Sequence, residues 1–148
     1  MPTSARNFFS REEKNRIRQA ILNAELDTSG EIRVHIENHC KGEPKERAAD
    51  VFALLKMQET ELRNGVLFYL AIKDRKFAIL GDKGINAAVG DNFWDEIKAK
   101  MSGAFAEGEF ADGLVEAIRL AGHQLKKHFP HQTDDINELS DEISFGSK

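Results

Sequence analysis

Apolar residues recur at helical or strand spacing along most of the chain. Ser10 opens a Ser-Arg-Glu-Glu run that fits a capping box, and apolar residues at helical spacing follow it. This pattern predicts a first helix over residues 11–24. Residues 31–37 alternate with period two instead, which predicts a strand with one face buried. The inward residues of that strand are Ile32, Val34 and Ile36.

The middle of the chain predicts a helix and a hairpin. Apolar spacing gives a second helix over residues 45–57, and residues 66–72 are apolar on both faces, as in a central strand. A tight turn at 73–75 leads into a strand over 76–80, so these two strands must be antiparallel neighbours. The first two strands are separated by a helix, which favours a parallel crossover between them.

Two more helices are predicted after the hairpin. The glycines of the Gly-Asp-Lys-Gly run at residues 81–84 interrupt the strand pattern, and Asp91 can cap the next helix. A last helix starts near Phe110 and stops at Pro130. The order is α-β-α-β-β-α-α, which predicts an α/β fold with a mixed sheet and helices on both faces.

Composition and charge narrow the class of protein. The chain has 148 residues with 41% hydrophobic and 31% charged, enough for one packed domain, which we place at residues 1–130. Residues 131–148 hold five acids against one lysine, and we expect a flexible acidic tail. The rest of the chain is neutral, with 20 acids and 20 bases, which argues against nucleic acid as a partner. Without a long apolar run or a signal-like N-terminus, we expect a monomer of the reducing cytoplasm.

Several familiar kinds of chemistry lack their motifs. The one cysteine, Cys40, follows His39, but neighbouring residues on an extended chain point to opposite faces, so a thiol–imidazole pair is not expected. His35 falls on the polar side of its strand, and the sequence contains no His-Glu-x-x-His motif, so a zinc site is not expected. Phosphate-binding loops and a nucleophile elbow are also absent from the sequence.

Acidic and amide side chains converge at one edge of the predicted sheet. If the first two strands are parallel, the start of the second and the end of the third meet beside the loop before the first. This brings together five oxygen ligands, and such a hard donor set suits calcium, magnesium or manganese. They are Asp27, Glu31, Asn64, Asp82 and Asp91. Turns are rich in these residue types anyway, and a capping role for Asp91 stays open.

Residues 63–86 run Arg-Asn-Gly-Val-Leu-Phe-Tyr-Leu-Ala-Ile-Lys-Asp-Arg-Lys-Phe-Ala-Ile-Leu-Gly-Asp-Lys-Gly-Ile-Asn, and a second glycine-containing stretch covers residues 105–114. These two stretches resemble the TPM domain, a family named for thylakoid, photosystem II repair and nematode receptor-accessory proteins. Residues 63–86 contain Asn-Gly-Val, an apolar strand, an Asp-Arg turn and a second strand that ends at a glycine pair. Residues 105–114, Phe-Ala-Glu-Gly-Glu-Phe-Ala-Asp-Gly-Leu, are similar to the family's Phe-x-x-Gly-x-Tyr-x-x-Gly-Leu stretch. The resemblance covers about residues 10–129.

The resemblance implies a three-layer α/β/α sandwich of Rossmann-like appearance. It also implies divalent-cation binding at acidic loops and, from a plant thylakoid member, acid phosphatase activity, whereas other relatives resemble accessory factors. This chain departs from the family at the usual Gly-Tyr-Gly-Leu-Glu, where it has Gly-Asp-Lys-Gly-Ile-Asn at residues 81–86. An acid, Asp82, therefore follows the first glycine, and Asn86 replaces the usual glutamate.

Three functions follow as hypotheses. The first is a divalent-cation-binding domain with weak or no phosphatase activity. The second is a non-catalytic accessory module that binds a protein partner. The third is a true metal-dependent phosphatase in which Asp82 or Asp91 orients a bound water.

Overall fold

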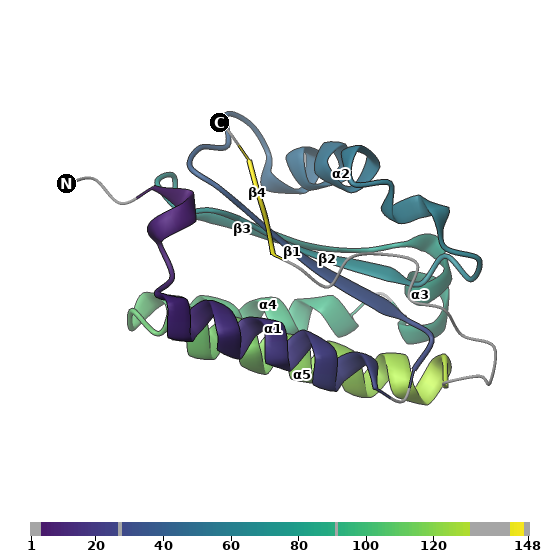
Figure 1. Cartoon of the computed structure of the whole chain (residues 1–148). Coiled ribbons are helices and arrows are strands. Elements are labelled where there is room, and N and C mark those ends of the chain that lie inside the picture. The colour runs from purple at the N-terminus through teal and green to yellow at the C-terminus, as the bar shows by residue number, and fades with distance from the viewer. Residues whose placement is uncertain (1–3, 27, 91, 131–142, 147–148) are drawn as a thin grey trace.

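A mixed four-stranded sheet lies between two layers of helices (Figure 1). The computed structural model describes residues 4–26, 28–90, 92–130 and 143–146. The strand order is β3-β2-β1-β4, with β2 parallel to β1, β3 antiparallel to β2, and β4 parallel to β1. The strands are β1 (Glu31–Glu37), β2 (Gly65–Ala71), β3 (Lys76–Gly81) and β4 (Ser144–Phe145).

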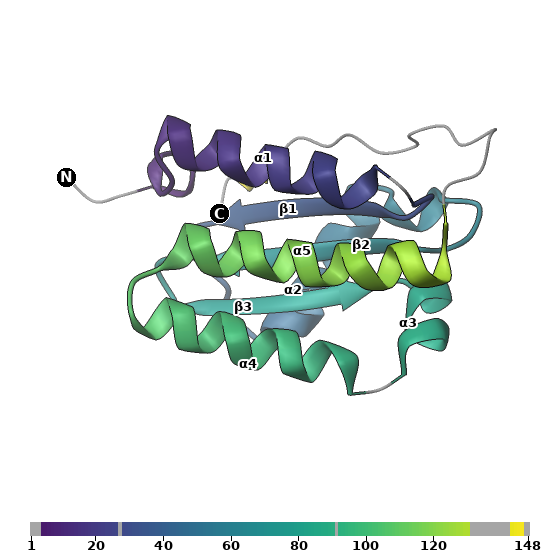
Figure 2. The same cartoon turned by 90° about the horizontal axis from the view of Figure 1, so that it is seen from below.

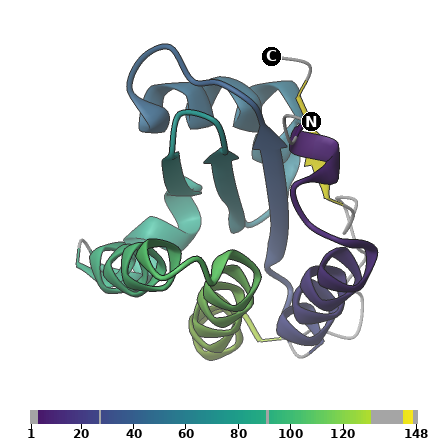
Figure 3. The ribbon, with the colours of Figure 1, turned by 90° about the vertical axis from the view of Figure 1, so that its left-hand side faces the viewer.

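The helices cover both faces, as the sequence predicted. Helices α1, α4 and α5 lie side by side on one face, and α2 covers the other (Figures 1 to 3). The helices are α1 (Arg11–Glu25), α2 (Pro44–Leu54), α3 (Lys83–Val89), α4 (Phe93–Ala106) and α5 (Phe110–His128), with short 3-10 turns η1 (Ala5–Asn7) and η2 (Met57–Glu59). The three-layer α/β/α sandwich is therefore confirmed.

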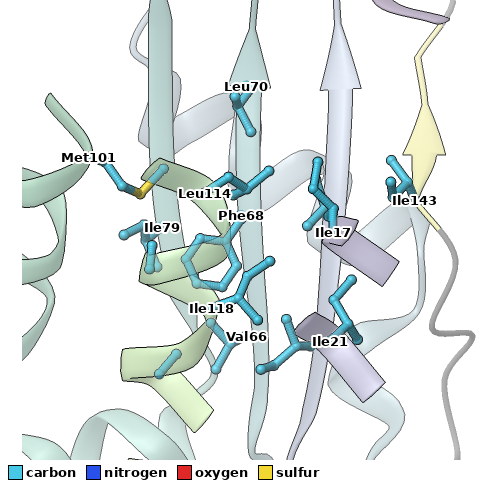
Figure 4. Packing of buried hydrophobic residues seen from close by; sticks show 14 of the residues in the cluster. Ile17, Ile21, Val66, Phe68, Leu70, Ile79, Met101, Leu114, Ile118 and Ile143 are labelled. Carbon is cyan, nitrogen blue, oxygen red and sulfur yellow. The ribbon is translucent and has the colours of Figure 1, made fainter. Parts of the chain in front are cut away.

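Strand alternation divides the core into two parts. One face of β1 and β2 packs against α1, α4 and α5, as Figure 4 shows for Val66, Phe68 and Leu70 around the α5 residues Leu114 and Ile118. The opposite face packs under α2 with Leu67, Tyr69 and Ala71. Because β2 is buried along its whole length, it carries apolar residues on both sides, as a central strand should.

Several element boundaries match the sequence prediction closely. The capping box at Ser10 is present, with Glu13 N–H donating to the Ser10 hydroxyl at 3.1 Å and Ser10 N–H to the Glu13 carboxylate at 2.9 Å. The strand predicted over residues 31–37 is β1 itself. Helix α2 ends earlier than predicted, because Lys56 adopts a left-handed conformation with φ of 57°.

Three expectations are corrected. The Gly-Asp-Lys-Gly run was expected only to end the strand pattern, but it also begins a helix. Asp82 caps the short helix α3, which starts at the next residue. His35 does face away from α1, but it is 6% exposed and therefore buried, since β4 and α2 cover it. The C-terminal segment is not wholly a tail, because Ile143 is 5% exposed and residues 144–145 form β4. Residues 131–142 lie outside the described part.

In the described residues, none of the helices combines the length and the apolar character that a bilayer crossing needs.

Candidate functional site

Three of the predicted ligands lie at the end of the sheet where β1 and β2 begin and β3 finishes. Glu31 opens β1 and pairs with Gly65 at the start of β2, while Gly81 at the end of β3 pairs with Val66. The Glu31 N–H donates to the carbonyl of Asn64 at 3.5 Å, and the Asp82 N–H donates to the carbonyl of Gly65 at 2.9 Å. The backbones of Glu31, Asn64 and Asp82 therefore lie at the same end of the sheet, and we call these three residues the acidic rim.

Asp82 has two structural roles at this rim. Its carboxylate accepts a hydrogen bond from the Lys83 N–H at 2.8 Å, which caps α3. It also accepts two hydrogen bonds from Arg63, from Nε at 2.6 Å and from Nη2 at 2.9 Å. The pKa of the Arg63 guanidinium is raised by these bonds. The Arg63 guanidinium therefore already neutralises the charge of the Asp82 carboxylate, and an approaching cation would have to compete with it.

The loop before β1 is hydrogen-bonded to the C-terminal end of α5. The Thr28 hydroxyl lies 2.9 Å from the carbonyl of Leu125, contacts the carbonyl of Phe129 and accepts the Gly30 N–H at 3.0 Å. The next residue, Ser29, has its hydroxyl 3.3 Å from Nδ2 of Asn64. This fastening places the loop beside the acidic rim and makes Thr28 a positioning residue that sequence reasoning missed.

A second polar cluster lies under α2 at the far end of β1, and the sequence did not predict it. Glu37 is fully buried and accepts hydrogen bonds from Arg47 Nε at 2.8 Å, from Arg47 Nη2 at 3.0 Å and from the Tyr69 hydroxyl. His35 Nε2 lies 3.3 Å from the same carboxylate. The available signal was the lone tyrosine in an apolar strand, because a buried tyrosine hydroxyl usually has a polar partner.

The electrostatics of this buried cluster follow from the partners of Glu37. Burial by itself would raise the pKa of Glu37, but the hydrogen bonds from Arg47 and Tyr69 outweigh it and hold the pKa below its usual range. Burial and the bond to Glu37 raise the pKa of Tyr69, and burial lowers the pKa of His35. The cluster therefore holds an ionised carboxylate and a neutral phenol at pH 7.

The hairpin turn is tied to the segment that follows β1. Asp74 accepts the Cys40 N–H at 2.7 Å and lies 3.1 Å from Nδ1 of His39, whose side chain is 55% exposed. Cys40 is 3% exposed. The His39 imidazole is therefore exposed beside Asp74, whereas the Cys40 thiol is buried 3.5 Å from the carbonyl of Gly42.

The chain matches a known family over most of its length. The family model for the TPM domain matches residues 3–124. The chain belongs to the TPM domain family. No curated protein matches it.

Three solved structures are similar to this chain. This TPM domain is 49% identical to the BA42 protein of the psychrophilic bacterium Bizionia argentinensis, with a TM-score of 0.87, over 94% of this chain and 96% of that one. The N-terminal domain of cg2496 from Corynebacterium glutamicum is 14% identical with a TM-score of 0.66, over 88% of this chain and 82% of that one. An N-terminal domain of a P. gingivalis protein is 16% identical with a TM-score of 0.67, over 84% and 82%. The last two show the fold alone.

The family motifs occupy tightly packed positions in this TPM domain. Gly84, in the first turn of α3, lies so close to the loop before β2 that a Cβ there would be 2.2 Å from the carbonyl oxygen of Leu62. Asn86, which replaces the family's usual glutamate, donates to the carbonyl of Gly81 at 2.8 Å and accepts from the Trp94 indole at 2.8 Å. These contacts give Asn86 a structural role between β3 and α4.

The described rim residues carry oxygen donors of the kind that a hard cation prefers. Their donors are carboxylate and amide oxygens, which fit calcium or magnesium, and Glu31 and Asn64 are buried at 4% and 2% exposure. In the described ranges, however, no group of three or more His, Cys, Asp or Glu is arranged to hold a metal ion. The other two predicted ligands, Asp27 and Asp91, lie outside the described residues.

Proposed function

We propose that this TPM domain binds a divalent cation at the acidic rim. The ligands would be Glu31, Asn64 and Asp82, with Asp27 and Asp91 as the further ligands that the sequence predicts. The observation that carries the proposal is the convergence of three oxygen-bearing residues from separate segments at one end of the sheet. Calcium, magnesium and manganese all favour such oxygen ligands.

Arg63 limits the affinity of this site. Because its guanidinium holds both oxygens of Asp82, a cation must share or displace that partner before it gains the carboxylate. We therefore expect weak binding in the unmodified chain. The variant Arg63→Asn keeps a residue type that tolerates the left-handed backbone at this position, φ of 51°, and removes the competing charge.

Calorimetric titration with Ca²⁺ and Mg²⁺ tests the site. We expect saturable binding that strengthens in Arg63→Asn and is lost in Asp82→Asn. The matched control Asp50→Asn removes a carboxylate from the exposed surface of α2 and should leave binding unchanged. Equal heats in all four proteins would mean nonspecific attraction and would reject the site.

Phosphatase activity is a finer proposal that depends on the cation. A bound cation would polarise a phosphate ester and lower the pKa of a bound water. The chain's own contribution would be to orient that water through Asp82 or Asp91. Turnover of p-nitrophenyl phosphate that requires the cation and falls in both Asp82→Asn and Asp91→Asn would support it, and turnover that survives both changes would exclude these residues.

The alternative is a non-catalytic accessory module that binds a protein partner. It is favoured by the Arg63 pair, since that pair satisfies Asp82 without any cation. A titration with no heat at millimolar cation in both the unmodified chain and Arg63→Asn would select this alternative.

A further inference from the structure

The C-terminal residues 143–146 lie as an extended peptide along the free edge of β1. Ser144 pairs with His35 and Phe145 with Ile36 in parallel register, and the Gly146 N–H donates to the carbonyl of Ile36 at 2.9 Å. In Figures 1 and 3 this strand, in yellow, lies beside β1 at the side of the sheet away from β3. Residues 131–142 separate it along the chain from α5, so it reaches the sheet as a separate segment.

The first two positions of this peptide have distinct surroundings. Ile143 is 5% exposed and belongs to the main core. In Figure 4 it lies on the same face of the sheet as Ile17 of α1. The Ser144 hydroxyl lies 2.8 Å from Nδ1 of His35 and 3.3 Å from the carbonyl of Val34. The edge therefore provides a place for an apolar side chain and then a place for a hydroxyl.

The next two positions are also specific. The Phe145 ring lies 5.3 Å from the Arg6 guanidinium carbon and 5.4 Å from Nζ of Lys14, distances at which a cation interacts with an aromatic ring. At Gly146 a Cβ would lie 2.4 Å from Oε1 of Glu37. Only glycine fits there without a shift of the buried cluster.

We propose that the edge of β1 is a peptide-binding site whose present occupant is the chain's own C-terminal segment. Its ligand is an extended peptide with the pattern apolar–hydroxyl–aromatic–glycine, presented by a partner protein and added to the sheet in parallel with β1. Main-chain pairing supplies affinity in such strand addition, and the side-chain positions supply specificity. This site is separate from the acidic rim and does not depend on a cation.

The chain's own segment acts as a competitor in this arrangement. A ligand on the same chain as its site has a high effective concentration, so a free peptide competes poorly while the segment is in place. The strand has only two residues in the ladder, and short terminal elements open at lower free energy than the core. Opening of the segment is therefore the step that makes the site available.

The test uses the full-length chain and a synthetic peptide with the sequence of residues 142–148. In Gly146→Val the added side chain should displace the chain's own segment, and the peptide should then perturb the amide resonances of β1 around Ile36 in a saturable way. We expect an affinity at least about tenfold tighter than for the unmodified chain. The control Gly42→Val, at a glycine with open space around it, should behave as the unmodified chain. The same peptide with valine in place of its glycine should not bind.

Two results would overturn the proposal. One is a folded Gly146→Val that either keeps its segment in place or releases it and binds no peptide. The other comes from hydrogen exchange in the unmodified chain, which does not depend on the variant folding. If the Gly146 amide exchanges only as slowly as amides of β2, the segment is a fixed part of the core. We expect it to exchange faster than they do, and faster again in Phe145→Ala.

Discussion

Replacing Glu37 by glutamine would test how the buried cluster under α2 is held together. The change keeps the size of the side chain but replaces one acceptor oxygen by an amide that only donates. One oxygen of Glu37 accepts from Arg47 Nε and the Tyr69 hydroxyl, and the other accepts from Arg47 Nη2 and lies near His35. Whichever way the amide turns, one of its N–H groups must face an N–H of Arg47.

The expected cost follows from these contacts. A hydrogen bond to a charged group contributes about 1.5–3 kcal/mol, and a donor left buried without its acceptor adds about 1–3 kcal/mol. We therefore expect Glu37→Gln to lower the free energy of unfolding by about 2–4 kcal/mol at pH 7. Glu37→Ala, which removes the whole partner of the Arg47 guanidinium, should cost about 3–5 kcal/mol.

Urea unfolding followed by circular dichroism would measure these differences. The control Glu46→Gln makes the same charge change on the exposed surface of α2 and should stay within about 0.5 kcal/mol of the unmodified chain. The pH dependence provides a second check. Because the pKa of Glu37 is lowered in the fold, its contribution is fully present above the unfolded-state pKa of about 4.3 and is lost as the pH falls through the folded pKa.

Two outcomes would refute this reasoning about Glu37. A cost for Glu37→Gln no larger than that of Glu46→Gln would mean that the buried carboxylate is not held as an ion by Arg47. An equally steep loss of stability below about pH 4.3 in the unmodified chain and in Glu37→Gln would assign the acid sensitivity to other carboxylates.

Three further changes test the packing at the acidic-rim end of the sheet and at α1. Gly84→Ala should destabilise the fold by about 1–3 kcal/mol, because its Cβ would meet the carbonyl oxygen of Leu62 at 2.2 Å; a neutral effect in urea unfolding would contradict this. Ser10→Ala removes the capping box of α1 and should cost about 1 kcal/mol, measured as a lower midpoint of thermal unfolding. Thr28→Val removes the hydroxyl that joins the β1 loop to Leu125 of α5 and should cost about 1–3 kcal/mol. Hydrogen exchange of the Gly30 amide should then accelerate, and unchanged exchange would argue against that role.

The local pattern of apolar and turn residues was enough to predict most of the strands and their directions. Period-two alternation located β1 at its observed bounds, and the short turn after β2 required an antiparallel neighbour. Together with the parallel crossover that the intervening helix favoured, these two facts predicted that the backbones of Glu31, Asn64 and Asp82 lie at one end of the sheet, because strand direction decides which ends share an edge. The sequence thus determined the layers, the strand directions and the position of the acidic rim.

The tertiary structure alone decided which polar side chains are buried and by what. Alternation placed His35 on the face opposite the α1 core, but it carried no information on the segments that cover that face. That cover comes from α2, through the Arg47–Glu37 pair, and from Ser144, which lies more than a hundred residues away along the chain. The apolar pattern likewise did not predict the hydrogen bond from Arg63 to Asp82. Arg63 has a left-handed backbone conformation, which no apolar pattern encodes. Periodicity records which face of an element is apolar, whereas burial and pairing of charges depend on contacts between distant segments, and those form only when the chain is folded.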